Sequence, residues 1–397
     1  MTVPSWDVVR LTQALVRLPT LSCEELPAIR LLQDVMIELG YDDVRVDDVG
    51  NLIGIIGGGQ PGCIVLDGHL DVVPAGDETR WTRPPFGGRI EGDLIFGRGA
   101  TDMKGAVAAM VLAGGRLRKD DRTSRQTVCV SCSVAEELIE GLAFGSVCDA
   151  MRPSAVIIGE PTSLTLAIGQ RGRAELCVQT IGRAGHSAYP ETAVNALDKM
   201  VALLPRLHRT PLPEPHFVVG PALLVATDIA SLPYPADSVI PESCRVTMDR
   251  RLLPGETPNS VMGPLRDAIQ EARREDTALE ATVGIAQVEF ATHRGARLAG
   301  SKFVPGWFVP KDSWIVARAE AALASVGLVP HVTSYLACTN GSASAGVRGI
   351  PTIGFGPGDD EQSHRTDERV RISSLQRAEV AYAALARHLS ASEPLGG

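Results

Sequence analysis

The sequence has no excess of basic residues, since 38 Lys and Arg stand against 47 Asp and Glu, a formal net charge of −9. A protein that binds nucleic acid needs a basic face to neutralise phosphates, so the composition argues against that partner. The sequence also lacks any apolar run of the roughly 20 residues that cross a bilayer. Its first residues, MTVPSWDVVRLTQALVRL, lack the basic and then apolar pattern of a signal peptide. We therefore expect no membrane partner.

The chain shows little sign of cysteine chemistry. Its eight cysteines are scattered, and only Cys129 and Cys132 lie close together. Both fall within residues 127–134, an apolar run typical of a buried strand, and no second Cys pair or Cys/His partner completes a zinc motif nearby. We therefore expect buried thiols rather than a redox or zinc site, in a disulfide-free cytoplasmic enzyme.

The length and composition favour a globular protein of two or three domains, with 397 residues of which 44% are hydrophobic and 21% charged. Amphipathic or apolar patterns predict helices over 6–18, 25–39 and 105–118. Short apolar runs predict buried strands at 51–56, 63–66, 127–134, 155–158 and 352–355. Strands that alternate with helices in this way indicate an α/β fold with a mainly parallel sheet.

The middle of the chain has a different pattern, which predicts the order β-α-β-β-α-β of a ferredoxin-like α+β unit. The six expected elements are 174–181, 192–207, 217–227, 243–251, 259–275 and 281–292. Residues 294–312 read as an irregular return linker, and a helix over 313–325 rejoins the α/β domain. We therefore predict a discontinuous domain of residues 1–171 and 297–397, interrupted by an inserted domain of residues 172–296.

Residues that could carry chemistry follow apolar strands, where open α/β sheets place their ligand sites. They are His69, Asp71, Asp102, Glu136, Glu137, Glu160 and His364. Each also has a structural interpretation: Asp102 could cap a helix, and Glu136–Glu137 could be a surface acidic pair. Together they place two histidines and several carboxylates at one sheet edge, a set that suits zinc, cobalt or manganese. The ligands suffice for two ions that share a bridging carboxylate, a known hydrolytic arrangement.

A series of longer motifs spans nearly the whole chain. In order they are GHLDVVP, W-x-x-P-P-F, IFGRGATDMKG, AEE, GEPT, RAGHSAYP, DRRLLPGET and SHRTDE. With these motifs the chain resembles the M20 metallopeptidase family, which includes acetylornithine deacetylase, succinyl-diaminopimelate desuccinylase, aminoacylase and glutamate carboxypeptidase. Three segments most resemble the YgeY-type hydrolases: Asp249–Leu252, Cys338–Ser342 and Gly354–Gly358.

The resemblance implies two divalent metal ions, zinc first, with cobalt or manganese as alternatives. By resemblance, His69 and Glu160 would bind one ion and Glu137 and His364 the other. Asp102 would bridge both. The resemblance thus assigns the whole ligand set to the five strand-end positions.

The same resemblance implies three residues that act in catalysis without binding metal. Asp71 would orient His69, and Glu136 would be the general base. His186, in the GHSAYP motif of the inserted domain, would stabilise the developing oxyanion, although a loop histidine in a polar turn is the alternative interpretation.

Substrate contacts are expected at two further places. Arg250 suits a substrate carboxylate because a guanidinium matches its geometry, although an ion pair on a strand is an alternative and Arg251 beside it is a second candidate. Asn340 and Gly341 could form a turn, while the equivalent loop contacts substrate in the family that this chain resembles. An acidic residue typical of that loop is missing here, where Ala343 stands.

The resemblance therefore implies a dimetal-dependent amidohydrolase that uses metal-activated hydroxide to cleave the amide bond of N-acyl amino acids or small peptides. The inserted domain would serve as a lid and as the dimerisation surface of a homodimer. Alternatives are a dipeptidase or N-carbamoyl-amino-acid hydrolase on the same scaffold, and a catalytically inactive binding protein. A nucleotide-binding protein is a further alternative, but Gly57–Gly59 and Gly97–Gly99 lack the required fingerprint spacing.

Overall fold

The computed structural model describes residues 6–58, 62–119 and 127–390. Residues 1–5 of the N-terminal segment and Gly59 of the glycine run lie outside the described residues. The chain divides into two compact units. The first comprises Met1–Gln170, Glu289–Ala299 and Phe308–Gly397, and the second comprises Arg171–Val288 and Gly300–Trp307. Within the described ranges, no helix is both long and apolar enough to cross a membrane.

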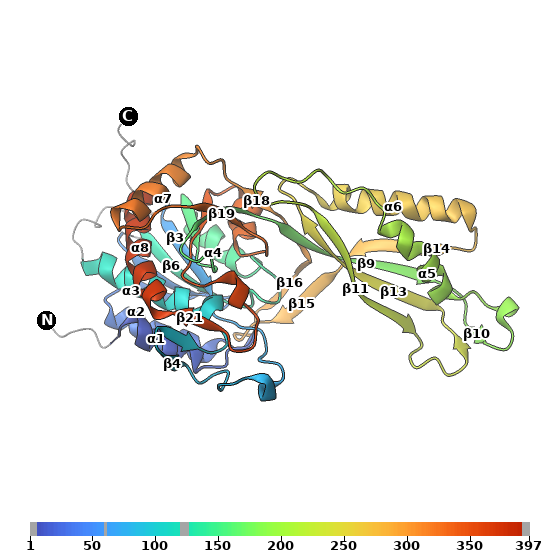
Figure 1. Cartoon of the computed structure of the whole chain (residues 1–397), viewed down its shortest axis with the longest axis horizontal. Coiled ribbons are helices and arrows are strands. Elements are labelled where there is room, and N and C mark those ends of the chain that lie inside the picture. The colour runs from blue at the N-terminus through green and yellow to red at the C-terminus, as the bar shows by residue number, and fades with distance from the viewer. Residues whose placement is uncertain (1–5, 59–61, 120–126, 391–397) are drawn as a thin grey trace. The chain divides into compact units, whose positions relative to one another are not determined.

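The first unit is built on a nine-stranded sheet (Figure 1). Its strands lie in the order β1 (Asp43–Val46), β2 (Leu52–Ile56), β6 (Val128–Ser133), β3 (Ile64–His69), β7 (Ala155–Ile158), β20 (Thr352–Gly354), β8 (Leu166–Gln170) and β18 (Trp307–Phe308), with β19 (Val332–Tyr335) paired to β8. The neighbours β6, β3, β7 and β20 run parallel, whereas β2 pairs with β6 and β8 with β20 in antiparallel fashion. The sheet is therefore mixed, with the predicted parallel arrangement at its centre.

Helices cover both faces of this sheet, which explains why its central strands are buried throughout. On one face lie α3 (Gly105–Lys119) and α8 (Ile372–Ser390). Here Gly68 allows close packing, because a Cβ at this position would lie 2.7 Å from Met103 and 2.9 Å from Val107. On the other face, α4 (Phe144–Met151) packs Phe144 against a cluster that includes Val65.

Three further helices belong to the first unit, α1 (Val8–Val16), α2 (Leu26–Glu38) and α7 (Trp314–Ser325). Each lies where the sequence predicts a helix. The first begins where the Asp7 carboxylate accepts a hydrogen bond from the backbone N–H of Arg10.

The second unit has the predicted ferredoxin-like arrangement. Its elements follow the order β9 (Gly172–Ile181), α5 (Ala196–Leu207), β11 (Leu223–Leu232), β13 (Ser243–Leu252), α6 (Pro258–Glu275) and β14 (Glu280–Ile285). The antiparallel sheet order is β11-β13-β9-β14. Buried residues alternate along β9 and β13 and pack with α5 and α6 into one core, as expected for a sheet that is covered on one face.

Some predicted elements differ from the structure. The strand expected at 217–227 lies at 223–232, and the strand expected at 281–292 is divided into β14 and β15 (Gln287–Ala291). The irregular linker predicted at 294–312 is wrong, because it contains β16 (Arg297–Ser301), which pairs with β15, and β17 (Phe303–Val304), which pairs with β9. These strands are short and partly exposed, so an alternating hydrophobic pattern has too few residues to be recognised.

Candidate metal centre

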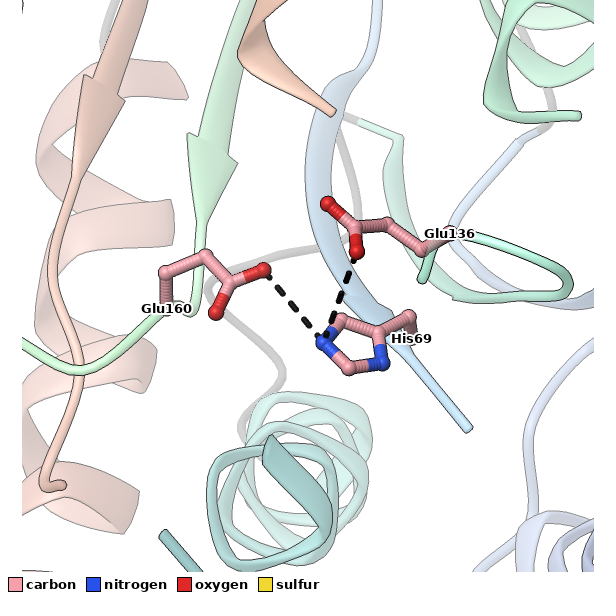
Figure 2. A group of neighbouring side chains, drawn as sticks. All are labelled: His69, Glu136 and Glu160. Atoms are coloured by element: carbon pink, nitrogen blue, oxygen red, sulfur yellow. Dashed lines mark ion pairs between the residues drawn. The ribbon is translucent and has the colours of Figure 1, made fainter. Parts of the chain in front are cut away.

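The structure brings seven of the predicted side chains to one edge of the central sheet. They are His69, Asp71, Asp102, Glu136, Glu137, Glu160 and His364. His69 is the last residue of β3, Glu160 follows β7, and Glu136 follows β6. Because these three strands are parallel neighbours, their carboxyl ends meet, and Figure 2 shows the three side chains pointing toward one another.

His69 directs one ring nitrogen at the carboxylates. Its Nε2 lies 3.1 Å from Asp102 Oδ1, 3.4 Å from Glu160 Oε1 and 4.0 Å from Glu136 Oε2. Its Nδ1 lies 2.9 Å from the backbone oxygen of Asp71 and 3.6 Å from the Asp71 carboxylate. An acceptor at Nδ1 fixes the ring orientation and favours Nε2 as the ligand atom, and the nearer acceptor is the Asp71 backbone rather than its carboxylate.

His364 lies on the other side of Asp102. Its Nε2 is 3.4 Å from Asp102 Oδ2 and 3.2 Å from Glu137 Oε2. The two carboxylate oxygens of Asp102 therefore face different histidines, one each. This is the arrangement that a bridging carboxylate requires, and the Asp102 side chain is directed into the cluster rather than toward the end of a helix.

Glu136 and Glu137 reach different histidines, but not because they alternate along an extended strand. Strand β6 ends at Ser133, and the chain then turns at Ala135, which has a φ of 55°. The Asp71 carboxylate accepts hydrogen bonds from the backbone N–H groups of Glu136 at 3.1 Å and Glu137 at 3.0 Å. The turn, held by Asp71, thus directs the two side chains apart.

The imidazoles of the cluster are strongly influenced by negative charge. Burial by itself lowers the pKa of His69, but the surrounding carboxylates, Glu160 foremost, raise it well above its usual range. Hydrogen bonds to Asp102 and Glu137 raise the pKa of His364 to about 10. Both rings thus experience an environment that favours a positive charge.

The carboxylates divide into two kinds. Burial raises the pKa of Glu136 well above its usual range, and Glu160 adds to the effect. Burial also raises the pKa of Glu160 to about 8, despite the attraction of His69. For Asp102, burial acts in the same direction, but hydrogen bonds with the two histidines lower its pKa below the usual range. The carboxyl groups of the cluster therefore outnumber the two imidazoles that could balance their negative charge.

This donor set fits divalent cations. Two overlapping groups, His69 with Glu136 and Glu160, and His69 with Asp102 and Glu137, each have potential ligand atoms within 4.8 Å of one another. Among the described residues, Glu136 Oε1 is buried with no hydrogen-bond partner. A set of closely spaced nitrogen and oxygen ligand atoms suits zinc or a similar ion. Metal binding would also release the protons that the crowded carboxylates hold in the absence of an ion.

A buried ion pair that the sequence analysis missed holds Asp102 in place. Glu368 Oε1 accepts hydrogen bonds from the backbone N–H groups of Thr101 at 2.9 Å and Asp102 at 3.1 Å. Its Oε2 lies 2.7 Å from Arg98 Nη1, and both side chains are almost fully buried. Arg98 also donates to the backbone oxygen of His364 at 3.4 Å. One ion pair thus contacts the segments that carry both Asp102 and His364.

Two predicted residues lie in the second unit. His186, in the short strand β10 (Gly185–His186), is exposed, and its Nδ1 accepts a hydrogen bond from the backbone N–H of Ala188 at 3.0 Å. Arg250 is 3% exposed, and its Nη2 lies 2.6 Å from Glu256 Oε1. Arg251 lies 2.8 Å from a neighbouring carboxylate on the same strand. Both guanidinium groups therefore have an acidic partner within their own unit.

The Asn340–Gly341 segment is buried in the first unit. Asn340 donates to Asp67 Oδ2 and Ser133 Oγ, both at 2.9 Å, and accepts from the backbone N–H of Gly141 at 2.7 Å. The Asn340 side chain thus links β3, β6 and the chain after Glu137. In the structure these hydrogen bonds hold the three segments together.

Comparison with known proteins identifies the chain's family. Residues 65–388 match the model of peptidase family M20/M25/M40. The chain belongs to this family. The match covers most of the chain and contains all five predicted metal ligands. The predicted family, α/β fold class and metal-dependent hydrolysis of amide bonds are confirmed at the level of the family.

Relatives of similar length agree with this assignment. The uncharacterized protein YgeY of Escherichia coli (strain K12) is 31% identical over 386 residues, which cover 96% of this chain and 93% of YgeY. A succinyl-diaminopimelate desuccinylase of Cereibacter sphaeroides (strain ATCC 17025 / ATH 2.4.3) is 32% identical over 394 residues, which cover 95% of this chain and 97% of the relative. The predicted resemblance to YgeY is thus confirmed.

Solved structures share the fold at lower sequence identity. Aminopeptidase PepT from Bacillus cereus ATCC 10987 matches with a TM-score of 0.73 and 18% identity, covering 96% of this chain and 98% of the other. The YXEP protein of Bacillus subtilis, a dinuclear metal binding peptidase from the M20 family, matches with a TM-score of 0.71 and 15% identity, covering 96% and 97%. Both matches extend over nearly the whole of each chain.

Proposed function

We propose that this protein is a two-metal hydrolase that removes the acyl group from an N-acyl amino acid. The observation that carries the proposal is Asp102, whose two carboxylate oxygens lie 3.1 Å from the Nε2 of His69 and 3.4 Å from that of His364. In this proposal Asp102 would be shared by two ions. His69 and Glu160 would complete one ligand set, and His364 and Glu137 would complete the other.

The bound ions, with zinc the first choice and cobalt or manganese the alternatives, would polarise the substrate carbonyl and lower the pKa of a water molecule. The protein's own part is to accept and return a proton. Glu136 suits this task because it lies 4.0 Å from His69 Nε2, and its Oε1 has no hydrogen-bond partner among the described residues. A carboxyl group at this place that is not itself a proposed ligand can accept a proton and pass it to the leaving amine.

His186 would donate a hydrogen bond to the developing oxyanion. Its Nδ1 accepts from the backbone N–H of Ala188, so the proton of a neutral ring lies on Nε2. The side chain is exposed on the second unit, which corresponds to the inserted domain predicted at residues 172–296 and which we propose to act as a lid. Replacing His186 with alanine should lower kcat by about 10²–10³ while the metal content stays constant.

Deacylation is favoured by the relatives with a known activity. The chain is 32% identical to a succinyl-diaminopimelate desuccinylase over 95% of its length. The test is a panel of acetyl-, succinyl- and carbamoyl-amino acids and dipeptides, each assayed with zinc, cobalt or manganese. The proposal is supported if the wild type hydrolyses an acyl-amino acid and Glu136→Gln does not. Preferential cleavage of dipeptides or carbamoyl compounds would replace it with those activities.

We also propose a cytoplasmic homodimer that forms through strand β11. This strand lies at the edge of its sheet, and it exposes Leu223 (38%), Val225 (51%), Ile229 (49%) and Leu232 (59%). An edge strand with exposed apolar side chains is suited to pairing with a second copy. Analytical ultracentrifugation should find a dimer, and Ile229→Lys should dissociate it. Ile37→Lys, at an exposed apolar site on α2 (60% exposed), is the matched control and should leave the dimer intact.

A further inference from the structure

The turn that carries Glu136 is held by side chains from three other segments. Its four consecutive backbone N–H groups, at residues 134–137, each donate to a side-chain oxygen. Asn51 accepts from residue 134 at 3.1 Å, Glu25 from residue 135 at 2.9 Å, and the two oxygens of Asp71 accept from residues 136 and 137. Ala135 has a φ of 55°, a left-handed conformation that is unfavourable for a non-glycine residue. The turn therefore depends on these acceptors.

Glu25 is the acceptor that itself needs a partner. Its side chain is fully buried, and its Oε1 also accepts from the backbone N–H of Cys23 at 2.8 Å. Its Oε2 lies 3.4 Å from Nδ1 of His293, whose side chain is 4% exposed. Within the described residues, neither Oε2 nor either ring nitrogen of His293 has a hydrogen bond. A buried carboxylate is costly without a partner, and the imidazole of His293 lies within ion-pair distance of this oxygen.

His293 also contacts the second acceptor segment. A Cβ built on Gly50 would lie 2.5 Å from Cε1 of His293, so the imidazole lies directly against the Gly50 backbone. Gly50 has a φ of +120° and precedes Asn51, the acceptor for residue 134. One ring thus packs against both Glu25 and the segment of Asn51, which together hold the first half of the turn.

The position of His293 in the chain gives this contact a further meaning. It lies in the turn between β15 and β16, within residues 289–299 of the first unit. At both ends this segment continues into the second unit, at residues 288 and 300. His293 therefore links two parts of the first unit. One is the segment at whose two ends the chain passes into the second unit, and the other is the set of residues that holds the turn of Glu136.

We propose that His293 is a positioning residue for Glu136, acting through Glu25 and the Gly50–Asn51 segment. The proposal rests on the proposed role of Glu136 as the base. His293 neither binds metal nor contacts substrate. It keeps the left-handed turn at Ala135 closed, so that the Glu136 carboxylate stays in the geometry needed for proton transfer.

The test compares His293→Ala with His293→Gln and with Arg294→Ala, an exposed neighbour in the same turn that serves as the matched control. On a substrate found in the panel, His293→Ala should lower kcat about tenfold or more, with KM and metal content unchanged. His293→Gln should recover part of this loss, because an amide of similar size can fill part of the same space and offers Glu25 an N–H donor. Equal kcat values for His293→Ala and Arg294→Ala, or a loss explained by lost metal, would overturn the proposal.

Hydrogen exchange makes the test independent of the substrate. In His293→Ala the amides of residues 134–137 should exchange about tenfold faster or more, while those of strand β7 keep their wild-type rates. If His293→Ala does not fold, His293→Gln carries the comparison, with a smaller increase expected. Wild-type exchange rates in a folded variant overturn the positioning role. A wild-type protein that hydrolyses no compound of the panel overturns the proposed function alone.

Discussion

Replacing Arg98 with methionine should destabilise the protein and weaken its metal site together. The substitution keeps the length of the side chain but leaves the fully buried Glu368 without the guanidinium that lies 2.7 Å away. Removing one partner of a buried ion pair typically costs about 3–5 kcal/mol, because the other charge remains desolvated. Glu368 would then hold the backbone of Asp102 less firmly. Loss of such support typically weakens metal binding about 10–100-fold.

The double variant Arg98→Met/Glu368→Gln separates charge from packing. A glutamine at position 368 can still accept from the backbone N–H groups of Thr101 and Asp102, but it leaves no buried charge. We expect it to recover more than half of the unfolding free energy lost in Arg98→Met, measured by urea denaturation of the metal-free protein. Glu361→Gln, an exposed glutamate in the same region, is the matched control. A loss below about 1 kcal/mol in Arg98→Met, or no recovery in the double variant, refutes the reasoning.

Two further outcomes follow from the site and its surroundings. Asp71→Asn should lower kcat about tenfold or more, because Asp71 uses one oxygen to accept from Glu136 and the other to accept from Glu137, and an asparagine keeps only one of these two acceptors. Steady-state kinetics at constant metal loading measures the effect, and an unchanged kcat would contradict it. Burial raises the pKa of the Cys129 thiol well above its usual range and that of Cys132 as well, so iodoacetamide at pH 8 should leave both unmodified in the native protein. Mass spectrometry that found rapid alkylation at either thiol would contradict this burial.

The predictable part of the site follows from local sequence signals. Apolar runs marked strands β3, β6 and β7, and a polar residue after each run marked the edge where His69, Glu136 and Glu160 meet. Parallel neighbouring strands then brought these residues together without any further information. The ferredoxin-like order of the second unit was predictable for the same reason, because its strands alternate and its helices are amphipathic.

The residues that support the site had no comparable signal. Glu368 acts on Asp102 across 266 positions and Glu25 acts on Ala135 across 110, and no local pattern reports such contacts. The turn after β6 was equally hidden, because its left-handed residue is Ala135 rather than a glycine. No local pattern therefore predicts the supported turn that directs the side chains of Glu136 and Glu137 apart.

The most direct test of the account is a metal count paired with turnover. Wild-type protein, Glu136→Gln and His364→Ala would be loaded with zinc, dialysed and analysed by elemental mass spectrometry, then assayed on the acyl-amino acids of the panel. We expect about two ions per chain in the wild type and in Glu136→Gln, with turnover lost in the latter, and about one ion in His364→Ala. A wild type that holds at most one ion, or His364→Ala that retains both, would contradict the two-metal site bridged by Asp102.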